Sequence, residues 1–523
     1  MSTKSVGQLR ILEFIGKPEL ASILKEKGYE LSGAQNLKSD DGSQFYSKKV
    51  IQHDSNLLEH ILFSLKYEGY NLFVLSAGLR NIPHNEMLEA YHISPNGTLT
   101  RKAAMLWEYA NQQALNIQER TTSKYIDFFD PDKYITGVER KNSKWRVNFN
   151  GIGDLNWCPV IQRTNELDDW LKKDLLTQSA NFAKEADERL LSRAMEWSFL
   201  SETKGSFAIE NEKPSYNKME SFVTILKRIK DNVTIDEECL CSLQNEVVSM
   251  PLDKAVSYRH SQNWLQLGSG RGPSSITYAP PEPSLVDSLM KGIESVSNQT
   301  SSINPICLAS AISYGFVFVH PFMDGNGRLS RCLIHHGMNK AKEMPQNLIL
   351  PISVAMKNNE SDYLKSLKGF SIPARKLCNV TWIDQDDFRF DWESNADLFF
   401  RYPDLTEQTV FIMDMTQYTL TELLESEIQF LKMYDKVYAE VNEQYDVRNK
   451  VLASLVTIAL KSNGSVSNKK RKKYADYISN EALEFLESSA KNALTQRAGA
   501  NDDGERGDSE LNASSPFNKK LNI

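Results

Sequence analysis

The sequence predicts a mainly α-helical protein, in which an α/β-mixed region precedes a helical core and a small helical or winged-helix-like region follows it. Apolar residues recur at helical spacing through most of the chain after residue 166. Alternation typical of a β-strand is confined to short segments. The length of 523 residues favours two to four domains.

The first region, residues 1–165, mixes both kinds of element. Its predicted elements are helices at 18–27, 57–66 and 100–115, a strand at 145–150, and an apolar run at 70–75 that fits either a strand or a buried helix segment. This region carries no constellation of catalytic residues, so we attach no activity to it.

The next region, residues 166–375, is the predicted core. Its predicted helices lie at 166–200, 218–230, 235–248, 284–297, 307–319, 328–342 and 360–370. Residues 376–495 are predicted to continue as helices, in the segments 384–443 (strongly amphipathic at 420–434), 447–460 and 468–477. Gly, Asp, Asn and Ser dominate residues 496–523, which predicts a disordered tail.

The overall composition excludes several classes of protein. The 61 Lys and Arg against 68 Asp and Glu give a net charge of −7, so the chain lacks the basic footprint of a general nucleic-acid binder. One basic run, at 469–473, fits a solvated helix face better than a DNA contact. No apolar run approaches the roughly 20 residues of a membrane span, and the start shows no secretory signal. Six scattered cysteines fit free thiols in a reducing cytoplasm.

Residues 320–331 read HPFMDGNGRLSR and carry the clearest chemical signal. His320 follows an apolar run and offers a neutral imidazole that can accept a proton from a hydroxyl. Asp324 suits Mg²⁺, which prefers one or two carboxylates plus phosphate oxygens. The turn Gly325-Asn326-Gly327 opens a predicted helix, where unpaired N–H groups and the helix dipole favour a phosphate. Arg328 and Arg331 are three residues apart and share one face of that helix.

This stretch resembles the signature of the Fic domain, HxFx(D/E)GNGRxxR, at every fixed position. Fic proteins mostly transfer AMP from ATP to a hydroxyl of a target protein, so the resemblance implies a protein adenylyltransferase acting on Ser, Thr or Tyr. It also implies a role for each residue: His320 as the general base, Asp324 as the Mg²⁺ ligand, the turn at Gly325, Asn326 and Gly327 as the cradle of the α- and β-phosphates, and Arg328 and Arg331 as the grip on the β- and γ-phosphates.

A second segment resembles the β-hairpin flap that in this family adds the target backbone as an extra strand. Asn263-Trp264-Leu265 and Ile276-Thr277-Tyr278 are joined by a Gly-rich link and followed by Pro280-Pro281. The resemblance assigns target docking to Ile276, Thr277 and Tyr278. It also places Tyr363 where the family often has an aromatic residue in contact with adenine.

A built-in inhibitory element is the third feature. Ser206-Phe207-Ala208-Ile209-Glu210-Asn211 resembles the family's inhibitory pattern (S/T)xxxE(G/N), with Asn211 in place of the commoner Gly. We expect Gly205 to end the preceding helix and Ser206 to cap a new short helix near 206–212. In the class with this element ahead of the core, the glutamate, here Glu210, pairs with Arg331 and occupies the seat of the γ-phosphate.

The resemblance leaves alternatives open. The same site suits transfer of another nucleotide or removal of AMP from a modified target. A rival from another class is a non-enzymatic Fic scaffold whose C-terminal region contacts DNA. The implied partners are ATP as substrate, Mg²⁺ and a target protein with an acceptor hydroxyl; self-modification and a homodimer stay open.

Overall fold

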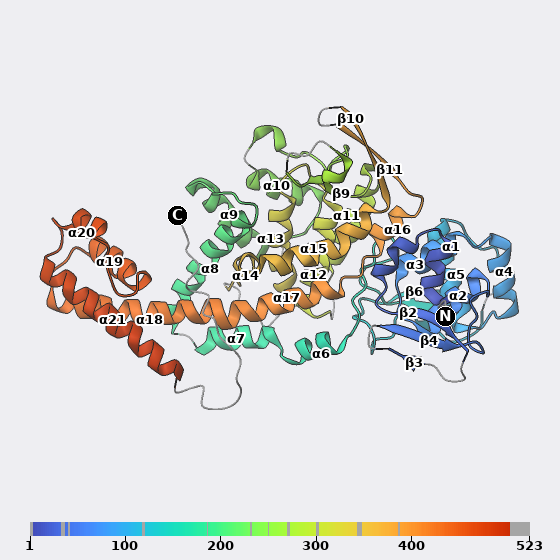
Figure 1. Ribbon diagram of the computed structural model, residues 1–523, viewed down its shortest axis with the longest axis horizontal. Coiled ribbons are helices and arrows are strands. Elements are labelled where there is room, and N and C mark those ends of the chain that lie inside the picture. The colour runs from blue at the N-terminus through green and yellow to red at the C-terminus, as the bar shows by residue number, and fades with distance from the viewer. Residues whose placement is uncertain are drawn as a thin grey trace. The chain divides into compact units, whose positions relative to one another are not determined.

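The structure is a computed structural model that describes residues 4–32, 37–39, 42–117, 121–185, 187–230, 233–248, 250–268, 272–299, 303–341, 348–384 and 387–502 (Figure 1). The chain forms two compact units, one of Met1–Glu185 with Met195–Leu420 and one of Ala186–Ala194 with Thr421–Ile523. Along the described residues, no helix is long and apolar enough to cross a membrane. The predicted segment boundaries at 165, 375 and 495 stay predictions.

The N-terminal part of the first unit confirms a mixed region. Four strands pair in the order β1-β2-β4-β3, where β2 (Lys27–Leu31) runs parallel to β4 (Ser43–Ser47) and antiparallel to β1 (Ser5–Val6), and β3 (Leu37–Lys38) forms an edge. Five helices accompany the sheet: α1 (Gly7–Phe14), α2 (Leu57–Tyr67), α3 (Leu72–Arg80), α4 (His84–Ile93) and α5 (Thr98–Asn111). A second sheet, β5-β7-β6, contains the predicted strand as β7 (Val147–Phe149) between β5 (Ile126–Asp127) and β6 (Arg140–Asn142).

One predicted element of this part is wrong, and one ambiguous prediction is resolved. The helix expected at 18–27 is wrong: only a 3₁₀ turn, Pro18–Ile23, forms before β2. Gly28 explains the strand, since a Cβ there would lie 2.9 Å from the Val6 carbonyl oxygen, so only glycine allows β2 to pair this closely with β1. The ambiguous run at 70–75 becomes helix α3, which the Asn71 side chain caps by accepting the Val74 N–H at 3.2 Å.

The core of the first unit is built around α12 (Pro305–Val319), which is buried on all sides, as expected for a helix that is apolar all round. It packs against α11 (Pro283–Asn298), α13 (Asn326–Met338) and α17 (Thr406–Tyr418). The other helices of this unit are α6 (Asn165–Lys172), α7 (Leu175–Glu185), α9 (Tyr216–Lys230), α10 (Glu237–Val247), α14 (Ile352–Asn358), α15 (Glu360–Arg375) and α16 (Ala396–Arg401). Helix α8 (Glu188–Ile209) begins in the second unit and enters this one at Met195.

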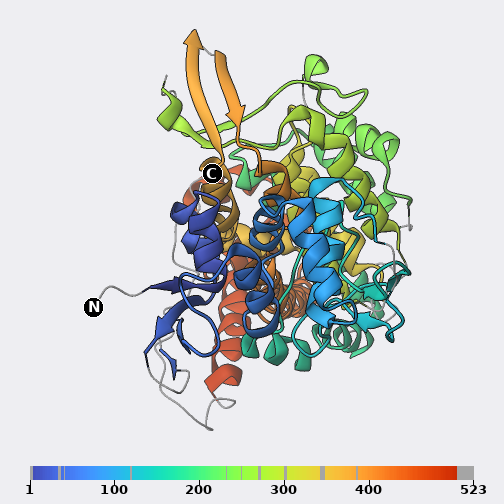
Figure 2. The same cartoon turned by 90° about the vertical axis from the view of Figure 1, so that its right-hand side faces the viewer.

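Two predicted helices of this unit are corrected. The stretch 166–200 is not one helix: Asp174, whose φ is +46°, separates α6 from α7, and α8 is a further separate helix. The long helices expected from residue 384 are preceded by a hairpin, β10 (Cys378–Asp384) with β11 (Asp387–Trp392). Every second residue along each strand is apolar, and the register places these residues on one face: Cys378, Val380, Trp382, Phe388, Phe390 and Trp392. The hairpin lies beside the strands of the expected flap (Figure 2).

The second unit contains helices α18 (Glu425–Gln444), α19 (Asn449–Lys461), α20 (Asn468–Tyr474) and α21 (Asn480–Asp502), after a π-helical segment Thr419–Leu424 that crosses the unit boundary. Its core contains Val437, Leu455 and Leu486. Residues 421–502 are all described and form no strand, so of the two predicted alternatives the helical one is found. The basic run forms α20, which buries none of its residues. The disordered tail predicted from residue 496 is wrong for 496–502, because α21 continues to Asp502; the rest of it, 503–523, lies outside the described residues.

Candidate active site

Residues 320–325 form a sharp reversal between α12 and α13. His320 ends α12 with a left-handed backbone at φ +52°, and Gly325 precedes α13 with φ +87°. Glycine adopts such angles freely, but for a side chain as large as histidine they cost roughly 1–2 kcal/mol. The loop therefore needs external support to hold the imidazole in place.

Three polar side chains supply that support. The Arg259 guanidinium donates to the carbonyl oxygens of His320 at 2.9 Å and Pro281 at 2.6 Å, and the Arg259 N–H donates to the Pro321 oxygen at 2.8 Å. Asn326 accepts from the Phe322 N–H at 3.0 Å and donates to the Phe322 oxygen at 2.7 Å.

The third of these side chains, Asn263, donates to the same Phe322 oxygen at 2.8 Å. Arg259 lies outside every motif, and no signal in the single sequence pointed to it. Burial of its guanidinium lowers the pKa of Arg259 to about 10.

His320 is presented as a neutral base. Its Nδ1 lies 3.1 Å from the Val317 carbonyl oxygen, which can only accept, so Nδ1 carries the proton and Nε2 keeps its lone pair. Burial, helped by the nearby Arg259 guanidinium, lowers the pKa of His320 to about 4. The imidazole is therefore uncharged at neutral pH and able to take a proton through Nε2.

The N-terminus of α13 is occupied by a carboxylate. Helix N-termini attract anions through their unpaired N–H groups and dipole, and no side chain caps this one. Glu210 lies there: its Oε1 is 2.8 Å from an Arg331 nitrogen and its Oε2 is 2.7 Å from Arg328 Nε. A Cβ on Gly327 would lie 2.6 Å from Glu210 Oε1, so the glycine leaves room for the carboxylate in this position.

Both motif arginines are buried, with side chains 1% and 2% exposed. Sequence reasoning paired Glu210 with Arg331 alone, whereas in the structure the carboxylate bridges Arg331 and Arg328. Arg328 also lies 3.2 Å from Glu212 and 3.2 Å from Asp324. For Arg331, burial disfavours the charge, but Glu210 and Tyr363 outweigh that cost and raise its pKa. The Glu210 carboxylate thus occupies the anion-binding site formed by the two buried arginines.

Glu210 directly follows helix α8, whose last turns contact α13. Ser206 accepts from Arg331 Nε through its hydroxyl at 2.9 Å and from another Arg331 nitrogen through its carbonyl at 2.8 Å. One turn earlier, the buried Glu202 accepts from the Ser353 N–H at 2.7 Å and lies 3.0 Å from His335 Nε2. Because these α8 residues are four apart, they share one face of the helix.

The predicted local structure of this segment is wrong in one respect. Gly205 does not end the preceding helix, and Ser206 is not an N-cap, because α8 runs unbroken to Ile209. Gly205 serves close packing instead, since a Cβ there would lie 2.7 Å from the Val354 backbone nitrogen. Asn211 follows the helix with φ +57°, a conformation that glycine and asparagine adopt most readily, so either residue fits this position.

Asp324 and Tyr363 lie close to the same arginines. The Asp324 carboxylate accepts from the Gly325 N–H at 2.7 Å and from Arg328 at 3.2 Å, and its side chain is 46% exposed. Tyr363, on α15, is buried with its ring stacked on Phe411 at 6.0 Å. The contact of Tyr363 with adenine stays a prediction.

The expected flap is a hairpin of β8 (Leu265–Gln266) and β9 (Ile276–Tyr278). Of its three predicted docking residues, only Thr277 is exposed. Ile276 is buried in a small apolar cluster, and the Tyr278 hydroxyl donates to the Phe318 oxygen below. The β10–β11 hairpin, which sequence reasoning missed, supports the flap, because Trp264 packs on Phe388 and Phe390 with ring centroids 5.5 and 5.6 Å apart.

Comparison with known proteins identifies the domain around this loop. The model of the Fic/DOC family matches residues 234–337, which include the whole motif and the flap. Residues 234–337 of the chain form a Fic domain. The chain is 32% identical over 94 residues to a Fido domain-containing protein of Dictyostelium discoideum, a match over 16% of this chain and 57% of that protein. It is 36% identical over 93 residues to a protein adenylyltransferase Fic of Drosophila grimshawi, over 17% of this chain and 18% of that protein.

Two solved structures also resemble the chain. One is a Fic domain-containing signalling protein from Bacteroides thetaiotaomicron, with 16% identity and a TM-score of 0.36 over 50% of this chain and 97% of that one. The other is a Fic family protein from Desulfovibrio desulfuricans, with 15% identity and a TM-score of 0.38 over 60% of this chain and 87% of that one. The matched sequence thus spans little more than half of the first relative and under a fifth of the second.

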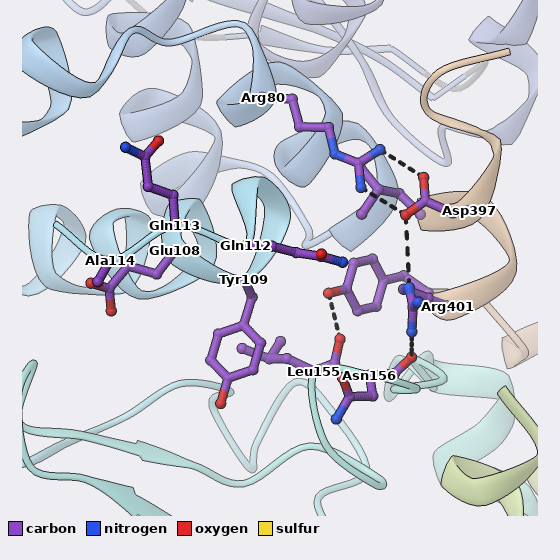
Figure 3. A pocket seen from close by; sticks show the side chains of 12 residues that line it. Arg80, Glu108, Tyr109, Gln112, Gln113, Ala114, Leu155, Asn156, Asp397 and Arg401 are labelled. Carbon is purple, nitrogen blue, oxygen red and sulfur yellow. Dashed lines mark hydrogen bonds and ion pairs between the residues drawn. The ribbon is translucent and has the colours of Figure 1, made fainter. Parts of the chain in front are cut away.

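A cavity of about 360 Å³ lies apart from the Fic motif, and none of the motif residues lines it (Figure 3). Its charged wall is already paired: Asp397 accepts two hydrogen bonds from Arg80, at 2.6 and 2.7 Å, and Arg401 donates to the Asn156 oxygen at 2.7 Å. The bonds from Arg80 join α3 to α16, and the bond from Arg401 joins α16 to the loop at Asn156, which fits a structural role.

Proposed function

We propose that this protein transfers AMP from ATP to a hydroxyl of a target protein, and that Glu210 holds it in an inhibited state. One observation carries the proposal. The carboxylate of Glu210 fills an anion seat built by Gly327 and two buried arginines, at the N-terminus of a helix whose preceding loop presents a neutral imidazole. A site that binds a carboxylate through two guanidinium groups and a helix N-terminus is also suited to the terminal phosphates of a nucleotide.

The residues support an in-line displacement at the α-phosphorus. His320 Nε2 takes the proton of the target hydroxyl, and the hydroxyl oxygen forms a bond to the α-phosphorus as the bond to the bridging α,β oxygen breaks. Pyrophosphate leaves with that electron pair. Arg328 and Arg331, freed from Glu210, stabilise its negative charge in a buried setting where such contacts are strong.

The donor set also fits Mg²⁺. Among the described residues, no three His, Cys, Asp or Glu side chains form a metal site of their own, so the protein would supply the single carboxylate of Asp324 and the nucleotide would supply phosphate oxygens. Asp324 is half-exposed, and within the described part of the chain its carboxylate bonds to Arg328 and a backbone N–H, so it can take this role once Arg328 turns to phosphate. The bound ion would neutralise phosphate charge.

One labelling experiment tests the proposal. The Glu210→Gly variant is incubated with Mg²⁺ and ATP labelled in either the α- or the γ-phosphate, and label on protein is measured. We expect label from the α-position alone, and its loss in the double variant Glu210→Gly/His320→Ala. Label from the γ-position, or equal labelling with and without His320, would overturn the assignment.

A further inference from the structure

Exposed apolar side chains gather beside the motif loop. Leu252 and Val256 are 96% and 97% exposed, and Met323, next to Asp324, is 58% exposed. Single exposed apolar residues are ordinary on protein surfaces, but a group of them beside an active site is a candidate binding surface. We call residues 252–257 together with Met323 the apolar shelf; the stretch also contains the charged residues Asp253 and Lys254.

The apolar shelf is fixed to the catalytic loop by hydrogen bonds. Gln244, on α10, donates to the Asp253 oxygen at 2.7 Å and to the Asp324 oxygen at 3.1 Å, and it accepts from the Ala255 N–H at 3.0 Å. Tyr258, at the end of the shelf, packs its ring on Phe322 with centroids 5.6 Å apart. The shelf is therefore attached to the loop that follows His320.

The far side of the apolar shelf faces an acidic cavity of about 680 Å³. Its lining contains four carboxylates and no lysine or arginine: Asp236, Glu237, Glu238 and Glu294. Ala255 and Val256 of the shelf line it as well. Tyr258 joins the two features, since its N–H donates to Glu237 at 2.7 Å and its hydroxyl donates to Glu294. Burial raises the pKa of Glu294, the hydrogen bond from Tyr258 opposes that rise, and the carboxylates of Asp236 and Glu237 add to it. The nearest cations stand outside the lining: Lys291 is coupled to Glu294 and Glu237, and Arg228 donates to Ser242.

We propose that the apolar shelf and this cavity bind one extended segment of the target protein, which carries an apolar residue and a lysine or arginine next to the acceptor hydroxyl. The inference rests on the proposed function and names its substrate class. The apolar residue would cover Leu252 and Val256, while the cation would enter the cavity and balance its carboxylates. The flap lies across the same loop, because Asn263 and Arg259 both hold the His320 carbonyl, so the segment would run between flap and shelf.

Matched peptides test this preference. Two synthetic peptides share one acceptor threonine; the first flanks it with leucine and two arginines, and the second carries asparagine and two glutamates at those positions. With the Glu210→Gly variant and α-labelled ATP, we expect at least a tenfold lower KM for the basic peptide, the effect of losing one buried apolar contact. Introducing Glu238→Lys should shrink or reverse the preference.

A second pair of variants locates the contact. Leu252→Asn with Val256→Asn should raise the KM of the basic peptide about tenfold. Ile93→Asn is the matched control, since Ile93 is 79% exposed but lies on α4, and its KM should equal that of the parent variant. Equal KM values for the two peptides, or for the shelf variant and the control, would overturn the inference.

Hydrolysis of ATP to AMP and pyrophosphate, with water as acceptor, is measured in the same samples. It distinguishes failure of the docking inference from failure of the proposed function. If this reaction proceeds but the peptides are not distinguished, the docking inference fails and the proposed function stands. If neither water nor any peptide or protein receives the α-label, the proposed function fails and the inference falls with it.

Discussion

The charge and the bulk of Glu210 can be separated by experiment. Glu210→Gly removes both, whereas Glu210→Gln removes the charge and keeps an amide of the same size over Gly327. If the inhibition were purely electrostatic, the two variants would be equally active. The structure predicts that activity falls in the order Glu210→Gly, Glu210→Gln, wild type. The side chain at position 210 fills the space over Gly327, where Glu210 Oε1 lies 2.6 Å from the place that a Cβ would take, so glutamine still obstructs this space.

The geometry sets the size of the effect. Breaking a buried ion pair by removing one partner costs about 3–5 kcal/mol. The two arginines are buried, but Glu210 is 26% exposed, so the low end, about 3 kcal/mol, applies. For Glu210→Gly, that corresponds to roughly a hundredfold tighter binding of the nucleotide phosphates between the two arginines. In Glu210→Gln, nucleotide binding should improve only about tenfold, because the amide oxygen still accepts a hydrogen bond from a guanidinium and competes with the phosphates.

The assay is the initial rate of α-label transfer at a fixed ATP concentration below saturation. Glu212→Gln serves as the control, because Glu212 also lies 3.2 Å from Arg328 but is 41% exposed, and such pairs contribute at most about 1 kcal/mol. Its rate should rise no more than about fivefold. A Gln variant as active as the Gly variant would refute the steric part of the reasoning, and a Gly variant no faster than wild type would refute the inhibition itself.

Three further predictions follow from the same contacts. Because burial lowers the pKa of His320 to about 4, its base form persists well below neutrality, and kcat/KM of the Glu210→Gly variant should stay level from pH 8 to pH 6; a decline through a midpoint near 6.5 would contradict this. Arg259→Met leaves buried carbonyl oxygens unpaired, so the free energy of unfolding in urea should fall by about 2 kcal/mol or more, and an unchanged midpoint would exclude a supporting role. Phe388→Ala removes a ring from beneath Trp264, so protease cleavage of the flap should accelerate and KM for protein targets should rise while nucleotide affinity holds; equal cleavage would show that the flap stands without the hairpin.

The motif was readable from the sequence because its chemistry is local. Its residues are consecutive, so helix geometry and turn conformation alone place the two arginines on one face beside a glycine turn. The helical nature of the core was readable for the same reason, since apolar periodicity is a property of each segment by itself. The β10–β11 hairpin was missed because its aromatic residues alternate within a charged stretch, and only pairing with the partner strand gives that alternation its meaning.

The sequence by itself determined the Fic motif, the candidate base and the presence of an inhibitory glutamate pattern. Only the tertiary structure decided that Glu210 bridges both arginines, that Arg259 holds the loop of His320, and that a hairpin supports the flap. The physical reason is distance along the chain. Glu210 meets Arg328 and Arg331 more than a hundred residues away, and such a contact depends on how α8 packs along α13, which no local pattern specifies.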